Sequence, residues 1–303
     1  FAEAFVVAYP ELAANQQMVA SVANAAVLIT VLVGAGWAIR IQYLILLILA
    51  AALVSFTIGA GELFSFERFV SNLAPGYTGG ASTLVMFALF FPAATGIMAG
   101  ANMSGDLRDP AKSLPVGTFA AIGVTALIYL GLIVLLAGGA DRADLISNSF
   151  IMNDVAVWPV LIIAGVFAAT LSSALGSMLG APRIMQAFAR DRVFKSLNFL
   201  GRGSGAGDEP RRATILTALV SQAAILLGDL NAIAPIITMF FMVTYGTLNL
   251  ACFYEYYSGN PSFRPRFKYS NWWIALIGTF GCLIAMLLID VVWAVVAMAG
   301  LYW

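Results

Sequence analysis

The feature that most constrains this chain is a series of long intervals that contain no charged residue. Nine such intervals begin after Glu11, Arg40, Arg68, Lys112, Asp154, Arg212, Asp229, Lys268 and Asp290. A helix needs about 20 mostly apolar residues to cross the hydrocarbon core of a bilayer. These continuous runs differ from the short alternating segments of a membrane β-barrel. We therefore predict an all-α polytopic membrane protein with about nine transmembrane helices.

Composition excludes most functions of soluble proteins. The chain is 61% hydrophobic and 10% charged, whereas soluble domains carry about 25% charged residues. It has no histidine, and its two cysteines, Cys252 and Cys282, lie in apolar runs, which leaves no catalytic triad with histidine and no thiolate cluster. We expect no enzyme activity, no cofactor and no metal centre beyond alkali cations. With a net charge of zero, the expected partners are inorganic ions and the lipid bilayer rather than nucleic acid; a homodimer is left open.

The basic residues are distributed unequally between the two sets of loops. Alternating passes put thirteen of the fifteen Lys and Arg residues on one side and leave Arg68 and Arg142 on the other. Because basic loops stay on the cytoplasmic side, we expect a multi-pass cell-membrane protein whose basic loops face the cytoplasm. The largest cluster is the basic loop 183–212, with contact to anionic lipid as the alternative reason for its charge. Its glycine-rich stretch 201–207 reads as a flexible linker.

One predicted span is interrupted at mid-depth. The apolar stretch from Ala81 to Asn102 contains Pro92-Ala93-Ala94-Thr95-Gly96, and proline and glycine there favour an unwound backbone. The half-helix that ends near Pro92 would present free carbonyl groups, and the half-helix that begins at Gly96 would present free N–H groups. One break could therefore hold a cation and an anion. The alternative is an ordinary proline kink packed against neighbouring helices.

The residues around this break resemble a known family. The run 90–107, FFPAATGIMAGANMSGDL, followed by Asp109-Pro110 and Pro115, is similar to the sixth-helix signature of the cation-chloride cotransporters. The similarity continues at 168–177, 180–183, 231–236 and 263–269. It covers essentially the whole chain, and it implies a single transmembrane transporter domain over residues 1–303.

The resemblance also implies a specific architecture. The fold would be the inverted-repeat five-plus-five transporter fold of the amino acid-polyamine-organocation superfamily, with the nine passes corresponding to the family's helices four to twelve. We therefore expect an N-terminally truncated chain that lacks the first two helices and most of the third.

Three sets of ion ligands follow from the resemblance. It assigns potassium to the Pro92 carbonyl and the Thr95 hydroxyl. It assigns chloride to the amides of Gly96, Ile97 and Met98 together with the hydroxyl of Tyr245. It assigns sodium to the Ala169 carbonyl and the hydroxyls of Ser172 and Ser173.

Each assignment has a simpler structural alternative. The Thr95 hydroxyl could bond back to its own helix, and the Tyr245 hydroxyl could pack against a local backbone acceptor. The serine pair overlaps a stripe of small residues with a spacing of four, which is typical of close helix packing. That stripe comprises Gly165, Ala169, Ser173, Ser177 and Ala181.

The resemblance predicts secondary-active symport of chloride with potassium and sodium by alternating access. The potassium-chloride branch of the family departs from the serine pair, so the pair Ser172-Ser173 favours sodium coupling. An amino-acid or polyamine permease of the same superfamily is the alternative, although the uncharged chemistry between Pro92 and Gly96 suits a small anion better than an amine. A membrane fragment that does not transport is a further alternative.

Overall fold

The computed structural model describes residues 1–77, 82, 83, 86, 90, 96–102, 104–148, 150–192, 195–205, 207–227, 230–263 and 270–300. Within these ranges the chain is helical and forms no strand, apart from an isolated antiparallel bridge between Ser204 and Glu209. The helices group into two compact units, which are described separately. Unit 1 comprises Phe1–Pro75 and Met98–Leu226, and unit 2 comprises Gly76–Ile97 and Leu227–Trp303.

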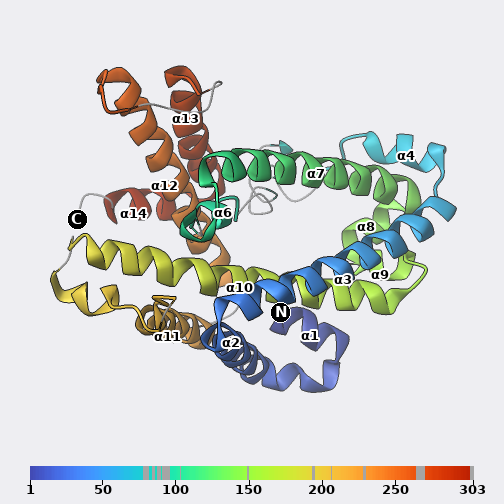
Figure 1. Ribbon diagram of the computed structural model, residues 1–303. Helices are drawn as coiled ribbons and strands as arrows, with labels where there is room; N and C mark the ends of the chain where they lie inside the picture. The colour runs from blue at the N-terminus through green and yellow to red at the C-terminus, as the bar shows by residue number, and fades with distance from the viewer. Residues whose placement is uncertain are drawn as a thin grey trace. The chain divides into compact units, whose positions relative to one another are not determined.

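Unit 1 contains most of the long helices (Figure 1). Its α-helices are α1 (Ala2–Ala8), α2 (Gln16–Val33), α3 (Ala35–Glu62), α4 (Phe66–Leu73), α6 (Ala99–Asn102), α7 (Pro110–Gly139), α8 (Arg142–Ser147), α9 (Ile151–Val155), α10 (Pro159–Arg190) and α11 (Arg211–Leu227). Short 3-10 helices are η1 (Pro10–Asn15), η3 (Ser104–Asp106) and η4 (Lys195–Gly201). Unit 2 contains α12 (Leu230–Tyr257), α13 (Trp272–Ile289) and α14 (Val291–Gly300).

Within the described residues, six helical segments are long and apolar enough to cross a membrane. They are Pro10–Val33, Gly36–Glu62, Pro110–Gly139, Pro159–Arg190, Ile237–Tyr257 and Trp272–Ile289. Each coincides with one of the nine predicted spans, and the prediction of an all-α polytopic membrane protein is confirmed. The helices α11, with 17 residues, and α14, with 10, are shorter, and half of the interrupted span, including residues 91–95, lies outside the described residues.

The core of unit 1 is the antiparallel pair α3 and α10. Ala38 and Ile45 of α3 share a buried cluster with the second half of α10, and Ala52 and Phe56 share another with its beginning. A Cβ built on Gly165 of α10 would lie 2.6 Å from the Cβ of Ala52. Small residues at this contact therefore set how closely the two backbones approach.

The beginning of α10 is joined to α3 by one buried serine. The Trp158 amide donates to Ser55 Oγ at 2.9 Å, and that hydroxyl donates to the Trp158 carbonyl at 3.3 Å. The Val157 amide donates to the Ser55 carbonyl at 3.3 Å. The first N–H groups of a helix have no partner within it, so Ser55 supplies one at the N-terminus of α10.

Arg68 and Arg142, the two basic residues predicted for the sparsely charged side, have structural partners. Arg68 donates to the carbonyls of Leu63 and Gly138, at 3.2 Å each, near the ends of α3 and α7. Arg142 donates to carbonyls at the end of α4. Cations at helix C-termini satisfy the last carbonyls and complement the helix dipole. Both arginines are therefore explained by helix capping.

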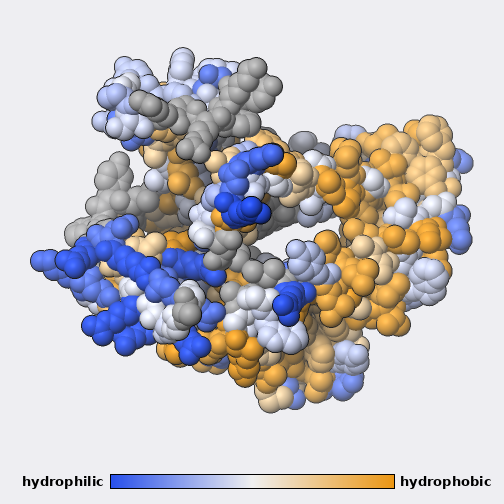
Figure 2. All heavy atoms as spheres, viewed as in Figure 1, coloured by the Kyte–Doolittle hydropathy of each residue, from blue (hydrophilic) through white to orange (hydrophobic). Residues whose placement is uncertain are grey.

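The glycine-rich stretch 201–207, which we predicted to be a flexible linker, is bonded to the end of α10 at its first residue and at the residue that follows it. Arg190 donates from Nε to the Gly201 carbonyl at 2.8 Å and pairs with Asp208 at 2.5 Å. Gln186, which is 8% exposed, donates to the Asp208 carbonyl at 3.1 Å. Figure 2 shows hydrophilic residues gathered at this end of unit 1, where α10 ends and α11 begins.

In unit 2, α12 and α13 pack side by side along their length (Figure 1). A Cβ on Gly278 would lie 2.6 Å from the side chain of Asn249, so the glycine admits that amide group into the helix contact. Asn249 donates to the Tyr245 carbonyl at 2.8 Å. Met239 and Met242 of α12 and Met286 of α13 are buried.

We predict that Gly59→Ala destabilises the contact between α3 and residues 155–157, which lead from α9 into α10. A Cβ at this position would lie 2.1 Å from the Val155 carbonyl oxygen, and relieving such an overlap costs about 1–3 kcal/mol. The measurement is the unfolding midpoint of the detergent-purified protein. Gly61→Ala is the matched control on the same helix, because a Cβ at Gly61 meets no atom within 4 Å. Equal midpoints for the two variants would contradict this packing.

Candidate ion-binding site

The hydroxyl of Tyr245 meets the amide of Gly96 within unit 2. The Gly96 N–H donates to the Tyr245 hydroxyl oxygen at 3.3 Å, across 149 positions of sequence. Tyr245 is 8% exposed, and its ring lies against that of Phe241 with centroids 5.9 Å apart. Two of the residues that the resemblance assigned to chloride are therefore neighbours in space.

Residues 96–98 form a turn, and the helix that we expected to begin at Gly96 begins at Ala99. Gly96 has a φ of +91°, a backbone conformation that glycine adopts at little cost because it lacks a Cβ. The amides of Ile97 and Met98 donate to no other described residue. Pro92 and Thr95, which the resemblance assigned to potassium, lie outside the described residues.

The serine pair of α10 presents its two hydroxyls to different surroundings. Ser172 lies on the face of α10 that packs against α3, where Ala168 and Leu175 are buried. Ser173 is exposed in unit 1, and Ala169, whose carbonyl was assigned to sodium, is half-buried. The Ser173 hydroxyl makes no hydrogen bond to another described residue, so its oxygen is free of competing partners there.

Gln42 of α3 contacts both oxygens of Ser172, and the sequence analysis did not identify this residue. The Ser172 hydroxyl donates to Gln42 Oε1, and Gln42 Nε2 donates to the Ser172 carbonyl at 3.2 Å. An uncharged polar side chain inside a membrane helix is a recognisable signal. Gln42, however, lies only two residues from Arg40 in the sequence, so it resembled a residue at the membrane interface.

The stripe of small residues on α10 is not buried along its whole length. Gly165 is buried against Ala52. Ser173 and Ser177, two and three turns further along, are exposed in unit 1. The packing alternative therefore accounts for Gly165 but for neither serine hydroxyl within this unit.

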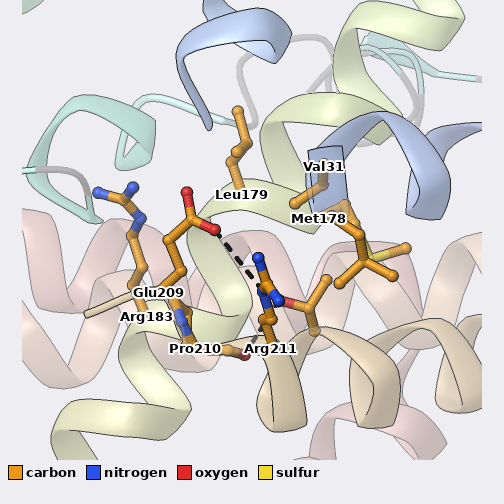
Figure 3. Close-up of a pocket in the computed structure, with 9 residues that line it drawn as sticks. Val31, Met178, Leu179, Arg183, Glu209, Pro210 and Arg211 are labelled. Carbon is orange, nitrogen blue, oxygen red and sulfur yellow. Dashed lines mark hydrogen bonds and ion pairs between the residues drawn. The ribbon is translucent and has the colours of Figure 1, made fainter. Parts of the chain in front are cut away.

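A small pocket lies elsewhere in unit 1, between the end of α2, the second half of α10 and the start of α11 (Figure 3). Its volume is about 20 Å³, enough for about one water molecule. Glu209 at its edge forms an ion pair with Arg211 at 4.0 Å. None of the predicted ion ligands lines this pocket.

The model of the amino acid permease family matches residues 4–302. The chain belongs to this family. It is 36% identical to human solute carrier family 12 member 1 and 35% identical to mouse member 2, each over 85% of the chain. It is 42% identical to mouse solute carrier family 12 member 8 over 71% of the chain. These alignments span only 28%, 25% and 32% of the respective relatives.

Family membership agrees with the motifs that were recognised in the sequence. The relatives carry the name of solute carrier family 12, the cation-chloride cotransporters, and this identification is confirmed. Within the family fold, the structure describes two groups of candidate residues, each inside one unit. Gly96 and Tyr245 form the first group, in unit 2, and Ser172, Ser173 and Gln42 form the second, in unit 1.

Proposed function

We propose that this permease-family chain belongs to a secondary-active symporter that moves chloride together with potassium and sodium by alternating access. The observation that carries the proposal is the meeting of the Gly96 amide and the Tyr245 hydroxyl in unit 2. Similarity to solute carrier family 12 over most of the chain supports it.

Chloride suits two convergent donors with no acidic group among them. The Gly96 amide and the Tyr245 hydroxyl can each donate one hydrogen bond. An anion that entered between them would replace their mutual contact of 3.3 Å with two charge-assisted hydrogen bonds, each about twice as strong as a neutral one. The Ile97 amide follows directly in the same turn of unit 2, and the resemblance assigns it and the Met98 amide to the same anion.

Sodium suits the oxygens of α10. A hard monovalent cation takes hydroxyl and carbonyl oxygens, which replace its hydration shell. The exposed Ser173 hydroxyl and the Ala169 carbonyl lie one turn apart on the same helix. We assign sodium to these two groups with Ser172, and potassium to Pro92 and Thr95 as the resemblance implies.

The amino-acid or polyamine alternative draws on the family's description as amino acid permeases. A cationic amine inside a membrane is usually paired with a carboxylate. In the six described membrane segments the acidic residues Glu11, Glu62 and Glu255 lie at or near the ends. This distribution favours the inorganic ions.

Three substitutions test the ion assignments. They are made in the whole protein, including any residues that precede or follow residues 1–303. We expect Tyr245→Phe to weaken chloride dependence, Ser173→Ala to weaken sodium dependence and Thr95→Ala to weaken potassium dependence. Each removes a ligand worth about 1.5–3 kcal/mol, which corresponds to about 10- to 150-fold in apparent affinity. The measurement is rubidium-86 uptake in membrane vesicles as a function of each ion.

Two matched variants control for the loss of a hydroxyl group alone. Tyr256→Phe removes another α12 hydroxyl, which donates to the Ser270 carbonyl at 2.8 Å, and it should leave chloride dependence unchanged. Ser177→Ala, one turn beyond Ser173, should leave sodium dependence unchanged. Unaltered ion dependence in all three test variants, with reduced uptake of an amino acid or polyamine, would favour the permease alternative.

The orientation predicted from the basic residues has its own test. Single cysteines are placed at two exposed positions, Ser196 in η4 and Ser147 in α8, in a background where Cys252 and Cys282 are alanine. We expect Ser196→Cys to react with an impermeant maleimide only in inside-out vesicles and Ser147→Cys only in intact cells, because basic loops are retained in the cytoplasm. The reverse pattern would invert the proposed topology.

A further inference from the structure

The contact between Gln42 and Ser172 has a direction that the chemistry of its groups determines. Gln42 Nε2 donates to the Ser172 carbonyl oxygen at 3.2 Å, and a carbonyl can only accept. The amide nitrogen of Gln42 must therefore face the carbonyl, which leaves Oε1 facing the Ser172 hydroxyl. A carbonyl oxygen in turn can only accept, so the hydroxyl donates its hydrogen to Gln42.

This direction decides what the Ser172 oxygen can offer to an ion. A hydroxyl has one hydrogen and two lone pairs, and it can coordinate a cation only when its hydrogen points away from that cation. Gln42 holds the hydrogen toward α3, so the Oγ lone pairs remain available on the other side. With the amide reversed, its NH₂ group would occupy a lone pair, and the hydroxyl hydrogen would be free to point at the cation.

We propose that Gln42 is a positioning residue for a sodium ion, acting through Ser172. This inference rests on the sodium site in the proposed function and adds to it a residue from a second helix. Partners in the outer shell of a metal site orient the ligands in this way, and their loss typically weakens metal affinity by about 10- to 100-fold. Because sodium is held more weakly than a divalent metal, we expect an effect of about 10-fold.

Gln42 and Ser172 are both half-buried in the contact between α3 and α10. A glutamine that served only to join the helices would stabilise the protein without regard to which ion is present. A positioning residue instead changes the apparent affinity for one ion, and it does so only while Ser172 is there to be positioned.

The test uses Gln42→Met, which keeps the length of the side chain and removes both hydrogen bonds, and Gln42→Asn, which keeps the amide but is one methylene shorter. Each is made alone and combined with Ser172→Ala. Rubidium-86 uptake gives the half-saturating concentrations of sodium, rubidium and chloride. Stabilisation of the detergent-purified protein by sodium, measured as a shift of its unfolding midpoint against choline, gives a second readout that needs no transport.

Gln222→Met is the matched control. Gln222 joins α11 to α2, since its side chain accepts from Asn24 at 3.2 Å and donates to Ser21 at 2.7 Å. We expect Gln42→Met and Gln42→Asn to raise the half-saturating sodium concentration about 10-fold, with a smaller rise for rubidium and chloride through coupling between the ions. We expect no further change in the Ser172→Ala background, and no change in sodium dependence for Gln222→Met.

Three results would overturn the inference. Unchanged sodium dependence and thermal stabilisation in both Gln42 variants would show that the contact only packs the helices. The same would follow if the Gln42 variants raised the half-saturating concentrations of all three ions equally. It would also follow if the effects of Gln42→Met and Ser172→Ala on the half-saturating sodium concentration were additive in the double variant. If the unaltered protein transports rubidium and chloride without sodium dependence, or transports no ion, both this inference and the proposed function fail. The measurement on the unaltered protein therefore distinguishes failure of the proposed function from failure of this inference alone.

Discussion

The structure depends on one requirement of the hydrocarbon core, where each backbone N–H and C=O group needs a partner within the protein. Long helices meet this requirement along most of the described chain. Where a helix begins or ends, a side chain takes over, as Ser55 does for the start of α10 and Arg142 for the end of α4. The turn at Gly96 follows the same rule, because its amide finds the hydroxyl of Tyr245.

The same requirement explains why polar side chains lie at helix contacts. Apolar surface gains little by moving from lipid to another helix, so close packing and hydrogen bonds between helices carry the association. In unit 1, Asn24 and Gln222 join α2 to α11, and Gln42 joins α3 to α10. A functional group can therefore be built into such a contact with little added cost, since the polar side chain already stabilises the pair.

Much of the fold could be predicted from the positions of the charged residues alone. The cost of a charge in the membrane makes their spacing a direct record of span length, and the six long spans agree with it. The bonds that Arg190 and Gln186 of α10 make to Gly201 and Asp208 could not be predicted, because the bonded residues lie 11 and 22 positions apart in the sequence. The composition of a segment does not show which distant residues will form hydrogen bonds with it in the folded protein.

The candidate site shows the same division. Gly96 indicated an irregular backbone, and it has a positive φ in the structure, but the helix that follows begins at Ala99 and not at Gly96. The partner of Ser172 was not evident, because Gln42 lies 130 positions away and only the register of α3 on α10 brings them together. Family motifs identify ligands that contact an ion, whereas the residues that orient those ligands depend on packing.

A phenol is well suited to the position opposite the Gly96 amide. Its hydroxyl can both accept and donate a hydrogen bond, so it accepts from Gly96 in the structure and, in the proposed function, would donate to chloride once the anion separates them. The Gly96 amide thus has a partner with and without the ion, while the Tyr245 hydroxyl changes from acceptor to donor when chloride enters. The hydroxyl of Ser172 differs, because its hydrogen stays with Gln42 while its lone pairs gain or lose the proposed cation. An anion site therefore needs donors that change partners, and a cation site needs hydroxyls whose hydrogens are held in place.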